Sequence, residues 1–365
     1  GIGMSGVRPN PRNLTSGLMK RLKNRPPGSD FFSFIDTPYN ILESKAYKEA
    51  DIINLHWVAD FLDWKTFFSK NTKPLVWTLH DQAPFLGGEH YSVNYSDVDA
   101  EGYPIKIEYS QQQLSYQKEV QEKKIKLLKS GTNLTIVSPS QWLLNESAGS
   151  EVFNSFPHFQ IPYGLPTSIF KPHNRNFARE VFNIKTNKTV LLFVSDYLNS
   201  HRKGFTYLKR ALALLPESVQ KEIFLCVVGS GAFISEGGYE SLNLGRITDE
   251  RMMSIIYSAA DAFILPSLED NLPNTMLESL ACGTPVLAFP VGGIRETIND
   301  GKNGFLSNDI SVNSLHDTLI RFINNKDQFK CDDISHRAIV HYSLETQARQ
   351  YLNLYSQILK GKSSI

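Results

Sequence analysis

Residues 262–289 read AFILPSLEDNLPNTMLESLACGTPVLAF, and this stretch decides the fold. It opens on four apolar residues, as a buried strand does, and 285–289 forms a second such run. Between them a helix is expected over about 273–282, because Pro273 suits a first helical turn and Gly283 suits a helix end. A strand, a helix and a strand in immediate succession predict a parallel sheet with helices packed on its faces.

The same alternation extends from this stretch in both directions. Further strands are predicted at 51–55, 74–79, 134–137, 159–162, 189–194 and 223–228, and further helices at about 108–129, from 140, at 204–215, 249–260 and 344–359. A chain of 365 residues has room for about two domains at roughly 150 residues each. The pattern therefore predicts two doubly wound, Rossmann-like α/β domains that face each other across a cleft.

The boundaries of these domains follow from the spacing of the strands. The first domain is expected at 1–165 and the second at 166–342, with 343–365 as a helix that packs back towards the first domain. Before residue 51 only the segment 31–35 resembles a strand. This leaves open whether the first domain is complete.

Composition excludes several classes of protein. Lys and Arg number 38 against 37 Asp and Glu, a net charge of +1, whereas a protein that binds nucleic acid through its phosphates is usually far more basic. The three cysteines are too widely spaced for a zinc knuckle or a redox CxxC pair. No apolar run approaches 18 residues and no apolar leader is visible, so a cytoplasmic protein that binds no nucleic acid is predicted.

Chemistry is expected at the carboxyl ends of the strands, where doubly wound domains bind ligands. The loop 266–273 is polar and leads into a helix whose first N–H groups form an anion site suited to phosphate. Glu278, one to two turns into this helix, is placed to accept hydrogen bonds from vicinal sugar hydroxyls. The alternative, a capped helix whose acidic first turn favours its dipole, remains equally open on these grounds.

The segment around Glu278 resembles the E-x7-E signature of the retaining glycosyltransferases of family 4, nucleotide-sugar enzymes with the GT-B fold. Other stretches fit the same family in the same order, and together they cover most of residues 51–310. They are Thr78–Asp81, Val137–Trp142, Arg202–Phe205, Leu244–Arg246, Tyr257–Asp261 and Gly292–Glu296.

This resemblance implies roles for individual residues. Glu278 matches the acid that holds the ribose hydroxyls, and Asp270, eight positions earlier, matches the acid that contacts the donor sugar, with Glu269 as a possible substitute. Lys203 matches the residue that holds the donor diphosphate. The family usually has an Arg five or six positions before this Lys, where this chain has Tyr197 and Leu198, so Arg202 is expected to serve instead. The whole predicted donor set is Arg202, Lys203, Gly229, Arg246, Glu269, Asp270, Asn271, Leu272, Pro273, Asn274 and Glu278.

His80 matches the family's His near the reacting carbon of the sugar, so His80, Lys203 and Asp270 are the predicted catalytic residues. Asp81 is expected to orient His80, and the alternative is a structural His bonded within its own loop. Two glycine pairs, Gly87-Gly88 on the acceptor side and Gly292-Gly293, are expected to allow a ligand to approach the backbone closely.

The resemblance also implies an activity. The expected reaction moves a sugar, with retention and without a metal or other cofactor, from a UDP- or GDP-linked donor to a glycan or lipid-linked acceptor in surface polysaccharide synthesis. The alternative is a non-catalytic module that binds sugar nucleotides on the same fold. A Rossmann dehydrogenase is excluded, because no strand–GxGxxG–helix unit is present.

Three charged segments receive less specific interpretations. Asp97-Val98-Asp99 spells the metal motif of another glycosyltransferase fold, but it lies in the predicted loop 86–104 and is interpreted as a chance match. The lysines of the helix at 108–129 are interpreted as a solvated face. The basic start of the chain predicts either contact with the inner face of an anionic membrane or a plain surface segment; its basic residues are Arg8, Arg12, Lys20, Arg21, Lys23 and Arg25.

Overall fold

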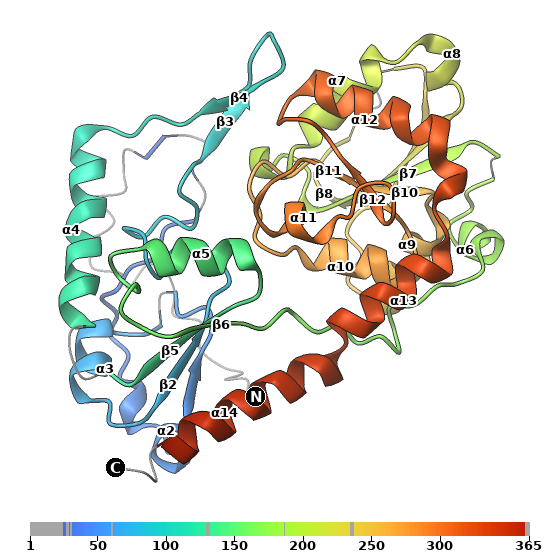
Figure 1. Cartoon of the computed structure of the whole chain (residues 1–365). Coiled ribbons are helices and arrows are strands. Elements are labelled where there is room, and N and C mark those ends of the chain that lie inside the picture. Colours follow the sequence, from blue (N-terminus) through green and yellow to red (C-terminus); the bar gives the residue numbers. More distant parts are fainter. Residues whose placement is uncertain are drawn as a thin grey trace.

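A computed structural model describes residues 25, 26, 29, 31–59, 61–128, 132–185, 187–233 and 237–361. Two parallel sheets lie side by side, each with helices packed against it (Figure 1). The predicted basic N-terminal segment falls outside the described residues except for Arg25, which forms an ion pair with Glu89. In the described part of the chain, no helix is both long enough and apolar enough to cross a lipid bilayer.

The first sheet is built from short strands, and its two central strands are fully buried. Its order is β1 (Ile53–Leu55), β2 (Leu75–Thr78), β5 (Leu134–Ser138) and β6 (His158–Gln160), and every pairing is parallel. Its helices before the second sheet are α2 (Lys45–Glu49), α3 (Trp64–Lys70), α4 (Gln111–Leu127) and α5 (Gln141–Gly149). Side chains of β2 alternate between two faces, so Leu75 and Trp77 pack in the core that includes α3 and α4.

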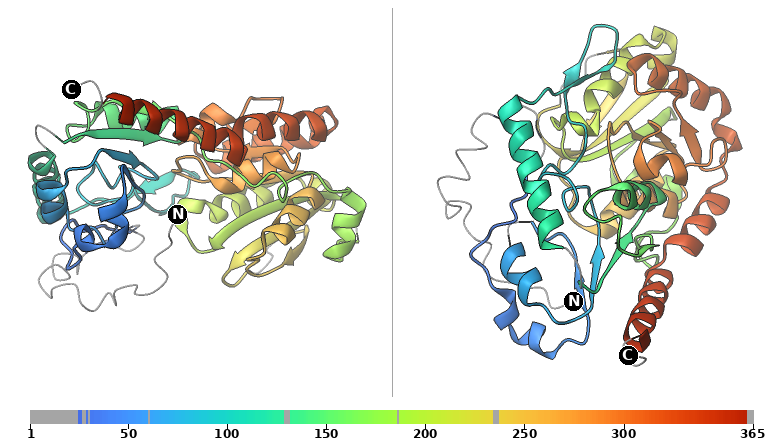
Figure 2. Two further views of the ribbon diagram at one scale, coloured as in Figure 1. Left: turned by 90° about the horizontal axis from the view of Figure 1, so that it is seen from below. Right: turned by 60° about the vertical axis from the view of Figure 1, so that its left-hand side comes forward.

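The opposite face of this sheet is covered by α14 (Leu344–Gly361), the last helix of the chain (Figures 1 and 2). Leu354 forms a buried cluster with Val76, Val137 and Ile161 of the first half. Two hydrogen bonds fix the same contact, Thr78 Oγ1 to Tyr351 Oη at 2.8 Å and Asn54 Nδ2 to Tyr355 Oη at 2.7 Å. The helices that cover the first sheet therefore include α14, which comes from the last part of the sequence.

The second sheet has the strand order β12-β11-β10-β7-β8-β9, all parallel. Its strands are β7 (Thr189–Tyr197), β8 (Ile223–Ser230), β9 (Glu240–Asn243), β10 (Ala262–Leu265), β11 (Val286–Ala288) and β12 (Gly304–Leu306). Its helices are α6 (Arg175–Val181), η3 (His201–Lys203), α7 (Phe205–Leu214), α8 (Glu217–Gln220), α9 (Glu250–Ala259), α10 (Asn274–Ala281), α11 (Gly292–Thr297), α12 (Val312–Asn325) and α13 (Cys331–Tyr342). The strand order reverses between β7 and β10, which is where open α/β sheets form a ligand crevice.

The chain crosses between the two halves twice, and the two crossings pair with each other. The Leu165 N–H donates to the Tyr342 carbonyl at 2.6 Å, and the Leu344 N–H donates to the Leu165 carbonyl at 3.1 Å. The segment 163–166, the hinge between the two halves, is therefore held against the start of α14.

The segment 86–104, predicted to be a loop, contains part of a β-hairpin, so that prediction was wrong. β3 (Tyr95–Val98) pairs with β4 (Pro104–Lys106), and the DxD match begins on the first of these strands. The hairpin reaches across to the second half: Arg210 of α7 donates to the carbonyls of Asp99 and Ala100, and the Val312 N–H of α12 donates to the Gly102 carbonyl. Its tip thus links the two halves (Figure 1).

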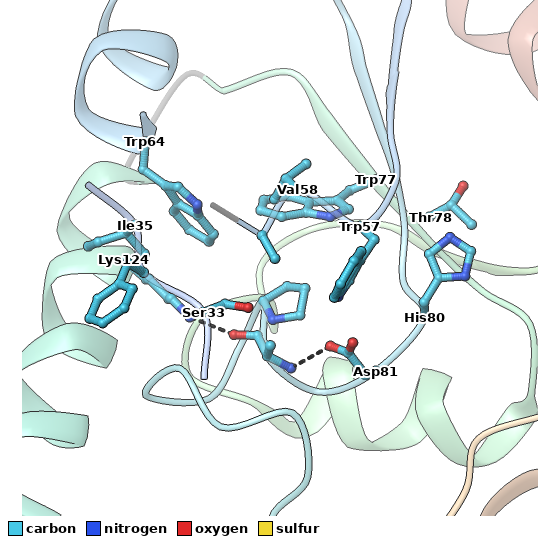
Figure 3. Close-up of a pocket in the computed structure, with 14 residues that line it drawn as sticks. Ser33, Ile35, Trp57, Val58, Trp64, Trp77, Thr78, His80, Asp81 and Lys124 are labelled. Carbon is cyan, nitrogen blue, oxygen red and sulfur yellow. Dashed lines mark hydrogen bonds between the residues drawn. The ribbon is translucent and has the colours of Figure 1, made fainter. Parts of the chain in front are cut away.

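The prediction of a solvated lysine face on α4 was wrong for Lys124, whose side chain is buried. Its Nζ donates to the carbonyls of Ala83 and Leu86 at 2.5 and 2.7 Å and lies 5.2 Å from the ring centre of Trp64 (Figure 3). Burial lowers the pKa of this lysine to about 7. Lys124 therefore holds the turn that follows β2 against α4.

Candidate functional site

The strand reversal brings two predicted segments together. The chain leaves β7 into η3, which carries Arg202 and Lys203, and leaves β10 into the acidic loop 266–273. Lys203 Nζ lies 2.6 Å from Asp270 Oδ2, and Arg202 Nη1 lies 3.6 Å from the same oxygen. The backbone joins the segments as well, since the Leu268 N–H donates to the Arg202 carbonyl at 2.8 Å.

The two neighbouring acids of this loop are in different environments. Burial alone would raise the pKa of Asp270, but Lys203 and Arg202 outweigh it and hold that pKa below its ordinary value. Burial raises the pKa of Glu269 to about 7, although it also accepts hydrogen bonds from residues 92 and 93. Glu269 therefore points at the first half of the chain, whereas Asp270 pairs with the cations of the second half.

Asn271 bridges the two halves. Its Oδ1 accepts a 2.6 Å hydrogen bond from Ser140 Oγ, and its Nδ2 donates to the His80 carbonyl at 3.1 Å. Ser140 also caps α5 by accepting from the Leu143 N–H, so one hydroxyl serves both contacts. The acid loop is thus fastened directly to the strand end that carries His80.

The start of α10 follows this bridge. Leu272 is buried, Pro273 is the N-cap residue with a φ of −65°, and Asn274 is exposed at the first helical position. In this first turn the Met276 N–H donates to the Pro273 carbonyl at 3.0 Å, whereas the N–H groups of Asn274 and Thr275 have no acceptor within the helix, as at any helix N-terminus. Asp270, the partner of Lys203, lies four residues before Asn274, in the loop that leads into this turn.

Glu278 lies one turn further along α10 and is only partly exposed. Tyr257 Oη, from the buried face of α9, donates to Glu278 Oε2 at 2.9 Å. Burial raises the pKa of Glu278 to about 7, while the Tyr257 hydrogen bond acts in the opposite direction. The hydrogen bond from Tyr257 therefore fixes the orientation of the Glu278 carboxylate. A carboxylate held in this way can accept hydrogen bonds from sugar hydroxyls.

Two predicted donor residues lie further along the same sheet edge. Gly229, with a φ of +155°, sits where a Cβ would come within 2.2 Å of the Ser195 carbonyl oxygen, so glycine is required there by close strand packing. Arg246 is exposed in the connection between β9 and α9. Neither contacts the Lys203–Asp270 pair in a recorded hydrogen bond or ion pair among the described residues.

His80 lies at the end of β2, but its partners differ from the expected one. Its Nδ1 is 2.8 Å from Tyr163 Oη and its Nε2 is 3.0 Å from His56 Nδ1, with the Tyr163 ring stacked on the imidazole. Burial and the neighbouring His56 lower the pKa of His80 to about 4, so the ring is neutral at pH 7. The prediction that Asp81 orients His80 was wrong, because Asp81 Oδ2 lies 2.7 Å from His90 Nδ1.

Protein atoms, not open space, lie on the side of each paired glycine where a Cβ would stand. A Cβ at Gly87 would meet the backbone of Gln117 on α4, and one at Gly88 would meet the Phe32 ring at 2.4 Å. A Cβ at Gly292 or Gly293 would collide with the carbonyl oxygens of Asp270 and Asn271 respectively. The first pair therefore lets the loop pack on α4 and Phe32, and the second lets α11 support the acid loop, while the expected close approach of a ligand at these positions stays a prediction.

A cavity of about 350 Å³ connects the two halves of the site. His80 and Asp81 line it from the first half, and Arg202 lines it from the second. Within the described ranges, no three His, Cys, Asp or Glu side chains are gathered as metal ligands would be. Whether the chemistry is independent of metal stays a prediction.

Sequence reasoning missed several residues of this site. Neither Tyr163, in the hinge, nor His56 was predicted as a site residue, yet both contact the His80 ring. Tyr91, whose ring lies 4.7 Å from the Arg202 guanidinium, was also missed. Their positions depend on how β1, the hinge and the loop after β2 converge, which no local pattern encodes.

Comparison with known proteins places this site in context. Residues 174–340 match the family described as glycosyl transferases group 1. Two curated relatives, both D-inositol 3-phosphate glycosyltransferases, come from Mycolicibacterium smegmatis and Corynebacterium urealyticum. The first is 28% identical over 45% of this chain and 39% of its own length, and the second 31% over 50% and 46%. The chain thus spans less than half the length of these relatives.

Solved structures match over a larger share of the chain. Sucrose-phosphate synthase from Thermosynechococcus elongatus superposes with a TM-score of 0.65 at 19% identity, covering 87% of this chain and 75% of that one. The Anabaena protein HepE, in complex with UDP and glucose, gives 0.61 at 20% identity, covering 86% and 80%. These similarities confirm the predicted GT-B fold, in which the two halves are Rossmann-like α/β units.

Proposed function

Since residues 174–340 match the family described as glycosyl transferases group 1, we propose that this protein moves a sugar from a nucleoside-diphosphate donor to an acceptor hydroxyl. In this proposal the second half binds the donor and the first half binds the acceptor. The transfer retains the configuration at the anomeric carbon and requires no metal. The sugar's reacting carbon sits in the cavity between His80 and Arg202.

The contact between Asn271 and the His80 carbonyl carries this proposal. It joins the acid loop of one half to the predicted reacting centre of the other at 3.1 Å. An enzyme that transfers a group between two substrates must hold both in one place. This hydrogen bond fixes the relative position of the two surfaces that would do so.

The donor end of the reaction uses the charges beside α10. Negative charge builds up on the leaving diphosphate as the glycosidic bond breaks, and Lys203, Arg202 and the first N–H groups of α10 are arranged to stabilise it. Glu278 then accepts hydrogen bonds from the ribose hydroxyls. The leaving phosphate itself takes the proton of the acceptor hydroxyl, so no side-chain base is needed.

The neutral imidazole of His80 has a positioning part in this scheme. Because its pKa is about 4, it adds no positive charge near a sugar carbon that becomes cationic in the transition state. Tyr163 and His56 hold both ring nitrogens, which fixes the ring orientation. The ring then closes one wall around the sugar.

The donor base and the acceptor are narrower parts of the proposal. HepE was solved with UDP-glucose as well as with UDP and glucose, which supports a UDP-linked donor here, with GDP as the other candidate. We place the acceptor among glycans or lipid-linked glycans of surface polysaccharide synthesis, with the enzyme in the cytoplasm at the inner face of the membrane.

A thermal-shift panel tests the donor site. Wild type, Glu278→Ala and the exposed control Glu217→Ala are melted with UDP, GDP, ADP and NAD. A ligand at a hundredfold excess over its Kd adds about 2.7 kcal/mol, which raises Tm on the order of 5–10 °C. A shift with UDP or GDP that is lost only in Glu278→Ala supports the proposal. A shift with NAD alone, or with none of the four ligands, contradicts it.

A further inference from the structure

The cavity between the halves exposes two large aromatic side chains at its rim. Trp57 is 57% exposed and Phe31 is 71% exposed, and both line the cavity together with His80 and Arg202. Figure 3 shows the Trp57 ring near His80, the residue placed beside the sugar's reacting carbon. Exposed aromatic surface at a concave site is typical of a binding surface for part of a ligand.

Both rings rest on one buried imidazole. His90 is 4% exposed, and the rings of Trp57 and Phe31 meet it edge to face, with centroids 6.0 and 6.3 Å away. Its Nδ1 lies 2.7 Å from Asp81 Oδ2 and its Nε2 lies 2.7 Å from Ser33 Oγ. Because both ring nitrogens have partners, the imidazole is a fixed support for the two aromatic rings.

This support continues into the core. The other oxygen of Asp81 accepts from the Ala83 N–H at 2.9 Å, and the Ala83 carbonyl accepts from the buried Lys124, as the dashed lines of Figure 3 show. The aromatic surface is therefore pre-organised before any ligand arrives, which reduces the ordering cost of binding.

The charges around the cavity favour a neutral ligand. Among the described residues that line it, Arg202 is the one Arg or Lys, and it is engaged by the protein itself. Its guanidinium donates to the Glu269 carbonyl, lies 3.6 Å from the Asp270 carboxylate and stacks on Tyr91. Asp81 adds a carboxylate to the same wall. Both oxygens of this carboxylate are paired as well, with His90 and the Ala83 N–H, so the described wall offers an anionic acceptor headgroup no uncommitted cation.

We propose that Phe31 and Trp57 form the acceptor subsite and bind a neutral pyranose ring, the end of a glycan, through the C–H face of the sugar. This inference rests on the proposed function, since it identifies the class of acceptor for that site. A pyranose presents axial C–H groups on one face and hydroxyls at its rim. The aromatic rings match the former, and the polar atoms of the cavity wall match the latter.

Saturation-transfer NMR in the presence of UDP tests the subsite without requiring turnover. The probes are methyl β-D-glucopyranoside, methyl α-D-mannopyranoside and myo-inositol 1-phosphate. We expect saturation of the ring protons of at least one neutral glycoside, with affinity about tenfold weaker in Trp57→Ala. Trp57→Phe should retain most of the affinity. Phe159→Ala, which removes a 40% exposed aromatic ring of β6 outside the cavity, should match wild type.

Two results would overturn the inference. One is preferential binding of the inositol phosphate, and the other is the lack of any glycoside signal that depends on Trp57. Thermal melts of each variant establish that it is folded. Donor hydrolysis is measured in parallel. Glycoside binding that depends on Trp57, without donor hydrolysis, would contradict the proposed enzyme but support the sugar subsite. Donor hydrolysis without this binding would support the enzyme and contradict the subsite.

Discussion

Lys203 and Asp270 form a 2.6 Å ion pair that joins the segments following β7 and β10, the two central strands of the second sheet. The pair is mostly buried, and it holds the ammonium group at the acid loop that leads into α10. A positive charge fixed at this point needs no reorganisation when a diphosphate leaves.

Removal of that charge should slow the reaction severely. Lys203→Ala is expected to reduce donor hydrolysis by ~10²–10³, the usual effect of deleting one such donor. Hydrolysis of UDP- and GDP-sugars is followed by nucleotide release, with Lys188→Ala, a lysine paired with Glu240 at the surface, as control. Equal and negligible rates in wild type and variant would instead favour the non-catalytic nucleotide-binding module.

Asp270→Asn should separate binding from transfer. The substitution removes the counter-charge from Lys203 and Arg202, so both cations become more attractive to a diphosphate and UDP should bind several-fold more tightly. Transfer should fall at the same time, because the predicted contact with the donor sugar is weakened. Isothermal titration and a transfer assay measure the two effects, and weaker UDP binding in this variant would contradict the assigned arrangement.

Glu269 should make stability depend on pH. Its pKa rises from 4.5 to about 7 on folding, so the folded state holds more protons between these values and stability falls as pH rises through this window. Its Oε2 is buried with no hydrogen-bond partner among the described residues. Glu269→Gln should therefore match wild type near pH 5 and exceed it by at most about 3 kcal/mol at pH 8. Denaturant unfolding of both proteins, with Glu217→Gln as control, measures the difference, and a gap independent of pH would refute the assignment.

Tyr163→Phe should impair turnover without affecting nucleotide affinity. The change keeps the aromatic stack on His80 but deletes the 2.8 Å hydrogen bond to Nδ1, which is worth ~0.5–1.5 kcal/mol. We expect kcat to fall about three- to tenfold while the thermal shift with UDP is preserved. Tyr197→Phe, at an exposed tyrosine, is the matched control. An unchanged kcat would show that Tyr163 does not position His80.

Lys124→Met should destabilise the first half of the chain. The new side chain fills a similar volume but leaves the carbonyls of Ala83 and Leu86 without their donor, at a cost of ~1–3 kcal/mol each. Lys126→Met, on an exposed position of the same helix, should have little effect. Calorimetry compares the two variants, and equal melting temperatures would mean that Lys124 does not hold this turn.

Most strands were predictable because parallel strands that are buried on both faces have continuous runs of apolar residues. The run 262–265 is one example, and 189–194 and 223–228 are others, although β7 and β8 continue into polar residues at the sheet edge. β9 and β12 were not predicted, because ESLN contains one apolar side chain and GFL only two, too few to form an apolar run. The roles of the donor residues were predicted from the family resemblance. The physical argument alone did not decide whether the acid loop and the helix after it form a ligand site or only a capped helix.

The rest of the site depends on contacts between distant segments. Asp81 follows His80 directly, yet successive residues point in different directions after a strand, and its partner is His90, nine residues on. The burial of Lys124 could have been predicted from helical spacing. Lys124 lies four residues after the apolar and buried Val120, on the same face of α4. Tyr163 reaches His80 only because the hinge passes the end of β2.

The route of α14 makes the first half of this molecule discontinuous in sequence. Topologically, the second sheet is an insertion between β6 and the helix that completes the first layer. A recombinant fragment ending at residue 165 would leave Val76, Val137 and Ile161 bare, and such an apolar strip invites self-association. Exchanging donor specificity between related proteins should therefore succeed as a cassette swap bounded by the paired crossings at Leu165 and Ser343, and not as a simple head-to-tail fusion.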